Sequence, residues 1–354
     1  MAQPQVPEVP TANATGAAED YDVSQREDVS KLRRHAVGLG GVLFLTLTGS
    51  APISAMLFNV PIMVGYGQGV GAPAAFLFAA IVLGVFAVGY VAMARKKTTA
   101  GGFYSYISHG LGRELGIGTG YGAVVAYSVF EASLAGGFAY FLGLKLNAYG
   151  VTISWPWLAL GMVAIIAILA YFDIRISSAV LAAGLVSEIV ILLIFDGFLF
   201  SRGHFNGSSL NIVNAFKGFP AQGKLAAGAV GIGLFFAFWS WVGFEMAPNY
   251  GEESKDPKRI VPRALYISVI GLGIFYTLTA WASLAGYKST TAAIAASQSN
   301  AANYFLTPAT QYAGHWVSST MSYLIITGSF ACGMAFHNTT ARYLYSLAPV
   351  SWIS

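Results

Sequence analysis

Long apolar runs, separated by short polar or charged segments, recur along most of the chain. A transmembrane helix needs about 20 mostly apolar residues. This length divides the sequence into eight predicted spans, at 37–66, 72–94, 117–147, 155–172, 179–200, 225–250, 261–286 and 316–345. A shorter amphipathic stretch at 102–112 precedes the third span, and residues 1–35 show no apolar period. We therefore predict a disordered tail over 1–35 and an all-α polytopic membrane domain over 36–347.

The composition supports the membrane class and orients the spans. Charged residues make up 10% of the chain, against about 25% in soluble domains. With the tail on the inside, 14 of the 19 Lys and Arg residues lie in the inner segments. Because inner loops are enriched in Lys and Arg, we predict a plasma-membrane protein with a cytoplasmic N-terminus. The single cysteine, Cys332, excludes an internal disulfide, and we expect no metal, no cofactor and no nucleic-acid partner.

Two of the predicted spans are interrupted near the middle of the membrane. The first breaks at residues 49–52, GSAP, and the sixth within residues 238–245, FWSWVGFE. Backbone groups freed by a break find no water in hydrocarbon, so such breaks are tolerated where they line a cavity. The two spans are five apart and thus run in opposite directions, as in an inverted repeat. The alternative is that both breaks are ordinary packing kinks.

Motifs spread over most of the chain resemble the amino acid–polyamine–organocation family of permeases. They are GGFYSY at 101–106, FWSWVGFE at 238–245, the loop over 252–263 and RYLYSL at 342–347. In this order they are specific for the family and not for a substrate. The resemblance implies a LeuT-like fold of two inverted five-helix repeats. It also implies secondary transport of amino acids or related amines by alternating access, often coupled to protons.

The two breaks suggest where a small-molecule substrate with a carboxylate and an ammonium would bind. Free N–H groups at the start of a half-helix attract the carboxylate, and free carbonyls at the end of the other attract the ammonium. The predicted substrate-binding residues are Thr48, Gly49, Ser50, Ala51, Pro52, Ile53, Phe238, Trp239, Ser240, Trp241 and Gly243. The alternative for Trp239 and Trp241 is packing in the core or against lipid.

Three carboxyl groups, those of Glu131, Glu188 and Glu245, fall near mid-membrane without a Lys or Arg at similar depth. Ionisable groups inside spans are expensive and are functional candidates, and desolvation favours the protonated carboxyl. We predict proton coupling at these groups, with Glu131 and Glu188 ahead of Glu245; the alternative is a hydrogen bond between helices. Thr327 and Ser329 form a candidate ion site, but such residues are common helix contacts, so protons are expected before sodium.

The sequence departs from the family pattern at two places. The first break reads Gly-Ser-Ala-Pro where many members have Gly-x-Gly, and residues 348–354, APVSWIS, do not resemble the family's continuation. We therefore expect an atypical C-terminal tail, an incomplete second repeat, and poor transport by a truncated or frame-shifted product.

Other functions remain open at this stage. A permease for polyamines or other organocations fits the acidic residues, and a non-transporting binding or sensing protein fits the expected truncation. A membrane enzyme is least favoured, because we find no nucleophile–base pair and no nucleotide loop in its proper context.

Overall fold

The computed structural model describes residues 37–99, 101–172, 178–204 and 210–351. The tail predicted at 1–35 therefore lies outside the described residues, as does the end of the tail predicted at 348–354. The described residues form helices and connecting segments, and they contain two isolated β-bridges but no β-strand.

The interrupted first span comprises α1 (Leu39–Ser50), α2 (Pro52–Ser54), a π-helical turn (Ala55–Asn59) and α3 (Val60–Tyr66). The interrupted sixth span comprises α9 (Val230–Trp239) and a 3₁₀ helix (Phe244–Tyr250). The continuous helices are α4 (Ala72–Lys96), α5 (Gly102–Leu111), α6 (Arg113–Ala148), α7 (Trp155–Tyr171), α8 (Ser178–Arg202), α10 (Pro257–Ala285) and α13 (His315–Ser351). Two short helices, α11 (Thr290–Ser299) and α12 (Asn303–Pro308), precede α13.

Within the described residues, seven helical stretches are long and apolar enough to cross a membrane, and α7 is an apolar helix of 17 residues just below that length. The predicted all-α polytopic fold class is confirmed. Two boundaries differ from the prediction. Helix α9 begins at Val230 and not at 225, because Ala229 donates its backbone N–H to the Tyr66 carbonyl at 2.7 Å in an extended segment. Helix α13 continues to Ser351, through part of the predicted tail.

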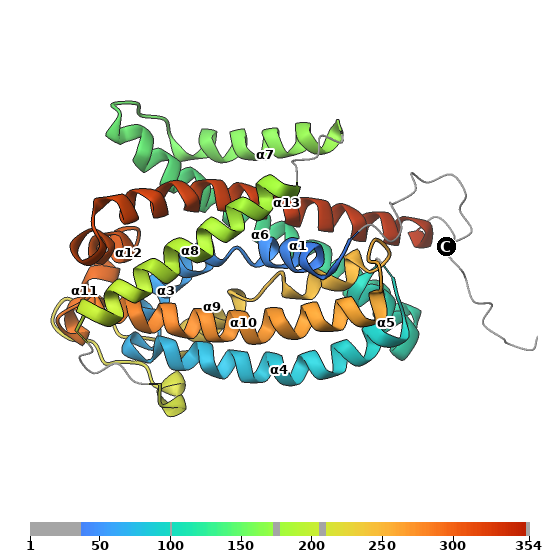
Figure 1. The fold of residues 1–354 in the computed structure, drawn as a ribbon, viewed down its shortest axis with the longest axis horizontal. Helices are drawn as coiled ribbons and strands as arrows, with labels where there is room; N and C mark the ends of the chain where they lie inside the picture. The colour runs from blue at the N-terminus through green and yellow to red at the C-terminus, as the bar shows by residue number, and fades with distance from the viewer. Residues whose placement is uncertain (1–36, 100, 173–177, 205–209, 352–354) are drawn as a thin grey trace, which may run out of the picture. The chain divides into compact units, whose positions relative to one another are not determined.

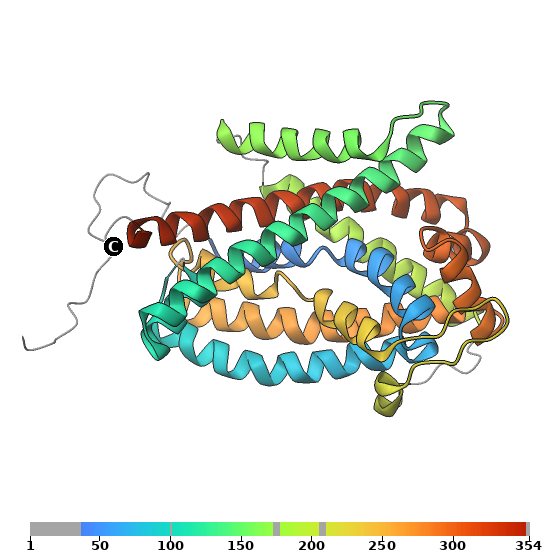
Figure 2. The same cartoon turned by 180° about the vertical axis from the view of Figure 1, so that it is seen from behind.

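The broken helices lie inside the bundle. In Figures 1 and 2, α1 and the segment after α9 run between α13 on one side and α10 with α4 on the other. Side chains from 50 to 57 are all buried. Helices α4 and α10 lie side by side along their length in both views, and α6 crosses α13.

One end of the first span is covered by the segments between the long helices. Gln298, in α11, donates from Nε2 to the Gly65 carbonyl, and Ser297 donates to the Pro61 carbonyl. Gln68 donates from Nε2 to the Ala215 carbonyl at 2.9 Å. Ser297 and Gln298 thus donate to carbonyls of α3, near the end of the helix, where the last turn lacks donors of its own, and Gln68 ties the chain just after α3 to the segment around Ala215.

Candidate functional site

The first break centres on Ala51. This residue has φ 36° and ψ 73°, a left-handed conformation, which costs a residue with a side chain about 1–2 kcal/mol. Its N–H still bonds back to the carbonyls of Leu47 and Thr48 at 3.1 and 3.2 Å. Pro52 follows as the first residue of α2 and supplies no N–H. The helix axis is therefore interrupted, with free backbone groups on both sides of Ala51.

Three side chains from three other helices satisfy these backbone groups. Cys332 donates from Sγ to the Gly49 carbonyl and Tyr276 donates from its hydroxyl to the Ser50 carbonyl, each at 3.1 Å. On the other side of the break, the N–H of Ile53 donates to Oε2 of Glu188 at 3.4 Å. The carboxyl of Glu188 thus occupies the place that the sequence assigns to a substrate carboxylate.

The second break follows α9 and closes around Gly243. The φ of Gly243 is 116° and its N–H donates to Oε2 of Glu245 at 2.8 Å. Just before it, the hydroxyl of Ser240 donates to the Phe236 carbonyl and accepts from Nδ2 of Asn59, both at 2.8 Å. Asn59 lies in the first broken span, so a side-chain hydrogen bond joins the two.

The backbones of the two breaks meet at a pair of glycines. A Cβ atom on Gly243 would lie 2.5 Å from the carbonyl carbon of Gly49 and 2.8 Å from the nitrogen of Ser50. Side chains of ordinary size cannot fit there, so glycine permits the approach. The structure brings together the predicted residues of the first break and those of the second around this contact.

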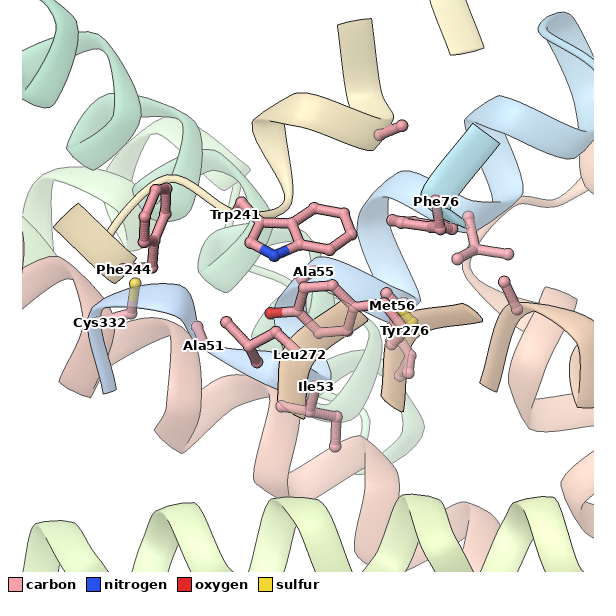
Figure 3. Close-up of a cluster of buried hydrophobic side chains, with 14 of the residues drawn as sticks. Ala51, Ile53, Ala55, Met56, Phe76, Trp241, Phe244, Leu272, Tyr276 and Cys332 are labelled. Atoms are coloured by element: carbon pink, nitrogen blue, oxygen red, sulfur yellow. The ribbon is translucent and has the colours of Figure 1, made fainter. Parts of the chain in front are cut away.

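Aromatic side chains fill the space beside the contact. Trp241 is 1% exposed, and its ring centroid lies 5.9 Å from that of Phe76 and 5.2 Å from that of Tyr276 (Figure 3). Its indole nitrogen is buried and has no hydrogen-bond partner among the described residues. In Figure 3 this nitrogen faces Ala55 and Tyr276. A buried donor without a partner is costly, so this N–H is suited to an acceptor on a bound ligand.

The other two predicted aromatic residues lie at the edge of this cluster. Trp239 is partly buried and stacks on Phe130 with ring centroids 4.8 Å apart. Phe238 is also partly buried and packs edge-on against Phe78 at 6.2 Å. Both Trp239 and Trp241 therefore pack on other aromatic rings, as the packing alternative states, and their role in substrate binding stays a prediction.

The three predicted carboxyl groups have different surroundings. Glu188 is 5% exposed, and its second oxygen lies against Gly328 of α13, where a Cβ atom would collide with it. Glu245 accepts from the Tyr127 hydroxyl at 2.7 Å as well as from Gly243, so both of its oxygens are used. Glu188 is therefore held by one long hydrogen bond and Glu245 by two short ones.

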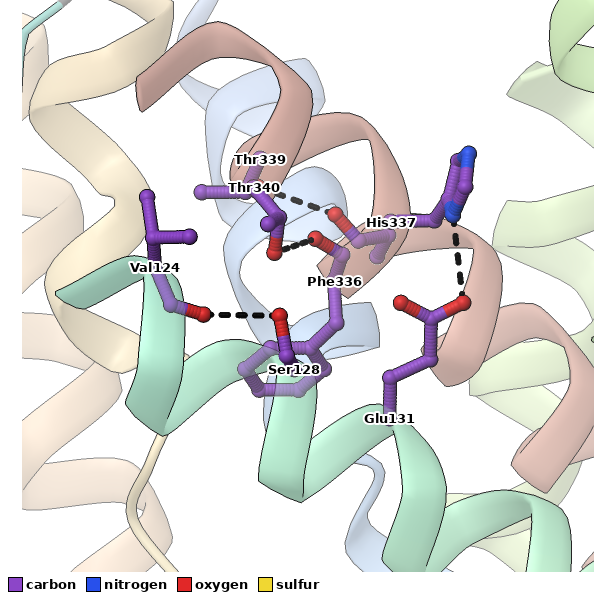
Figure 4. Close-up of polar contacts among 8 residues, drawn as sticks. Val124, Ser128, Glu131, Phe336, His337, Thr339 and Thr340 are labelled. Atoms are coloured by element: carbon purple, nitrogen blue, oxygen red, sulfur yellow. Dashed lines mark hydrogen bonds and ion pairs between the residues drawn. The ribbon is translucent and has the colours of Figure 1, made fainter. Parts of the chain in front are cut away.

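Glu131 has a partner that the sequence did not reveal. Its Oε1 is 3.1 Å from Nδ1 of His337, with 14% of the Glu131 side chain and 34% of the His337 side chain exposed. Figure 4 shows this pair bridging α6 and α13, beside hydrogen bonds that stay within each helix. The absence of Lys and Arg at this depth did not mean the absence of a basic group.

The two residues of the candidate ion site, Thr327 and Ser329, have different surroundings. Ser329 is fully buried and its hydroxyl lies 3.1 Å from that of Ser54 in α2, at the first break. Thr327 is exposed and bonds to the Tyr323 carbonyl of its own helix. Residues two apart on a helix do not face the same way, so the grouping of Thr327 with Ser329 is corrected: only Ser329 faces the break.

One buried carboxyl was missed by the sequence analysis. Asp196 is 4% exposed, accepts from the Thr279 hydroxyl at 2.7 Å, and has one oxygen without a partner among the described residues. It lies eight residues after Glu188 in α8, and both side chains are on the buried face of that helix. Asp196 could have been found from the sequence, because it is an acidic residue eight positions after Glu188 in the same apolar span.

Comparisons with known proteins agree with this architecture. A family model described as amino acid permease matches residues 39–353. Uncharacterized transporters of two Mycobacterium tuberculosis strains are 24% identical over 268 residues, which cover 69% of this chain and 54% of theirs. Cationic amino acid transporter 7, chloroplastic, of Arabidopsis thaliana is 25% identical over 204 residues, covering 54% of this chain and 34% of its own. The chain thus spans about half or less of the curated relatives it matches.

Proposed function

Because the chain belongs to the amino acid permease family, we propose that it binds an amino acid or related amine between the two helix breaks and serves its alternating-access transport across the plasma membrane. The observation that carries this proposal is the buried contact of the two breaks at Gly49 and Gly243. The substrate carboxylate binds the donors there, namely the Ile53 N–H and the indole N–H of Trp241. Its ammonium binds the carbonyls of Gly49 and Ser50. For the topology, the excess of Lys and Arg on one side of the membrane supports a cytoplasmic N-terminus.

We propose that proton coupling arises because Glu188 and the substrate carboxylate compete for the same donor, the Ile53 N–H. Glu188 accepts a hydrogen bond from the Ile53 N–H at 3.4 Å. Two carboxylates about 4 Å apart would repel each other by about 4 kcal/mol at an effective dielectric constant of about 20. A substrate carboxylate that takes this N–H therefore favours protonation of Glu188, so that substrate and proton bind together. Glu131 is the second candidate for coupling, through its contact with His337, and Ser329 with Ser54 is the remaining candidate for an ion.

The test is substrate binding by the purified chain, measured with a radiolabelled amino acid panel together with proton uptake from a weakly buffered solution. We expect about one proton taken up for each substrate bound, and loss of that uptake in Glu188→Gln. Asp196→Asn is the matched control, since it neutralises another buried carboxyl of the same helix that is not a coupling candidate. Glu131→Gln tests the second candidate separately. Binding without proton uptake by the unmodified protein would refute coupling, and persistence of proton-driven uptake in the Glu131, Glu188 and Glu245 glutamine variants would exclude all three groups.

A cationic substrate is the second candidate. Glu188 has no Lys or Arg partner within the described residues, so its carboxylate is available to an ammonium group. Competition between lysine and its decarboxylated amine separates the two proposals. If the amine competes as well as lysine does, the protein does not recognise the substrate carboxylate. The proposal of an organocation substrate then replaces the proposal of an amino acid substrate. Binding with no uptake by proteoliposomes would instead identify a binding or sensing role.

A further inference from the structure

A second site lies at one end of α4 and α10, away from the breaks. The last turn of α4 and the first turns of α10 enclose a half-open cavity of about 250 Å³. Its lining is Arg95, Lys258, Arg259, Pro262, Arg263 and Tyr266. Four of these six side chains are cationic, and none is acidic.

The positive charges in this cavity are poorly compensated by the protein. Arg259 lies 3.7 Å from Asp256, but 79% and 50% of their side chains are exposed, so this ion pair is weak. Arg95, Lys258 and Arg263 form no ion pair with the described residues. Arg259 and Arg263 are four residues apart on α10 and repel each other across one turn. A cavity built in this way favours an anion.

An apolar stripe continues from the cavity along the outside of α10. Ile267, Ile270 and Ile274 follow Arg263 and Tyr266 at spacings of three or four residues and are 48%, 59% and 59% exposed. Val85 and Val88 of the neighbouring α4 are 71% and 59% exposed. Since these helices are spans of a membrane protein, the stripe faces the acyl chains. Figures 1 and 2 show α4 and α10 side by side, so these exposed apolar residues belong to two neighbouring helices.

We propose that this cavity binds the headgroup of an anionic phospholipid, with its acyl chains along the isoleucine stripe. A phosphate group accepts forked hydrogen bonds from arginine, and basic pockets between membrane helices bind anionic headgroups. Free phosphate would use the same cations, whereas a lipid would also contact the isoleucine stripe next to them. The proposal is independent of the substrate site.

The test is binding of short-chain phosphatidylglycerol to the full chain in a neutral detergent, measured by native mass spectrometry and by thermal shift. Short-chain phosphatidylcholine and inorganic phosphate are the comparison ligands. We expect saturable binding of phosphatidylglycerol, and weakening of about thirtyfold in the double variant Arg259→Gln/Arg263→Gln, because each cation near an anionic lipid surface contributes about 1 kcal/mol. The double variant Arg259→Lys/Arg263→Lys keeps the charge and should retain most of the binding.

The matched control is Lys96→Gln/Arg113→Gln, which removes two exposed cations that do not line the cavity. Equal loss in this control would mean attraction to net positive charge alone and would overturn the proposal. Equal stabilisation by inorganic phosphate would assign the cavity to a free anion and not to a lipid. If the glutamine variant does not fold, Arg95→Gln and Lys258→Gln provide the same test one cation at a time.

Discussion

Replacement of Gly243 by alanine tests whether the two breaks touch as closely as described. The added Cβ would lie 2.5 Å from the carbonyl carbon of Gly49, 2.7 Å from its oxygen and 2.8 Å from the nitrogen of Ser50. All three are backbone atoms, so no flexible side-chain end can give way. The substitution must therefore separate the breaks or distort one of them.

The magnitude follows from two contributions. A side chain at φ 116° is strained by about 1–3 kcal/mol, and overpacking a close contact costs about 1–3 kcal/mol more. The expected total is about 2–6 kcal/mol. With an unfolding entropy of about 2.1 cal/mol/K per residue, the apparent Tm of this 354-residue chain should fall by roughly 3–8 °C.

The assay is thermal unfolding in detergent, followed by size-exclusion chromatography and by substrate binding on the same samples. Gly231→Ala is the matched control: this glycine lies within α9, and its Cβ would meet no atom within 4 Å. Alanine there should stabilise the helix by about 0.5–1 kcal/mol. Gly49→Ala should be milder than Gly243→Ala, because its Cβ would meet the flexible sulfur of Met246 at 3.0 Å. A Tm for Gly243→Ala equal to that of Gly231→Ala would refute the close contact.

Three further substitutions test the groups around the breaks. Gly328→Ala should displace the Glu188 carboxyl from the Ile53 N–H and lower the free energy of unfolding by about 1–3 kcal/mol. Combining it with Glu188→Ala should recover part of this loss. If thermal unfolding shows that the effects of the two substitutions simply add, the contact is contradicted. Tyr127→Phe should cost about 1–3 kcal/mol by leaving a buried Glu245 oxygen unpaired, whereas Tyr121→Phe, exposed on the same helix, should leave the Tm unchanged. Arg342→Gln removes hydrogen bonds to the Asn249 carbonyl and to Glu253 at 3.0 and 2.9 Å. The free energy of unfolding should fall by about 1–2 kcal/mol, and by less at high salt. An unchanged Tm would show that these hydrogen bonds are not needed for stability.

Apolar run length and helix-breaking residues were enough to predict the long helices and both interruptions, but not the short helices α11 and α12. The first break was placed at 49–52 and the structure has its left-handed residue at Ala51. The side chains that fill the breaks were beyond prediction, because they come from remote positions: Cys332 reaches Gly49 across 283 residues and Glu188 reaches Ile53 across 135. Hydropathy indicates which residues belong to a membrane span. It does not tell which helices pack against one another.

Helical periodicity could have improved two of the site assignments. Thr327 and Ser329 are two residues apart, so on a regular helix only one of them could face the first break. Glu188 and Asp196 are eight residues apart, which places both near one face. In both cases the spacing was visible in the sequence. His337 is different, since only the crossing of α6 and α13 brings it to Glu131.

Glu188 and Glu245 differ in how firmly each is attached to its break. Glu245 accepts hydrogen bonds of 2.8 and 2.7 Å from its own turn and from Tyr127, so moving its carboxyl would free a buried N–H and a buried hydroxyl at once. Glu188 comes from a separate helix and holds one N–H at 3.4 Å, while its other oxygen rests against a glycine. Releasing Glu188 therefore breaks one weak hydrogen bond, and a substrate carboxylate can replace it. Because exchange of a proton requires a group that can change its partner, we propose that coupling belongs to Glu188 and that Glu245 has a structural role.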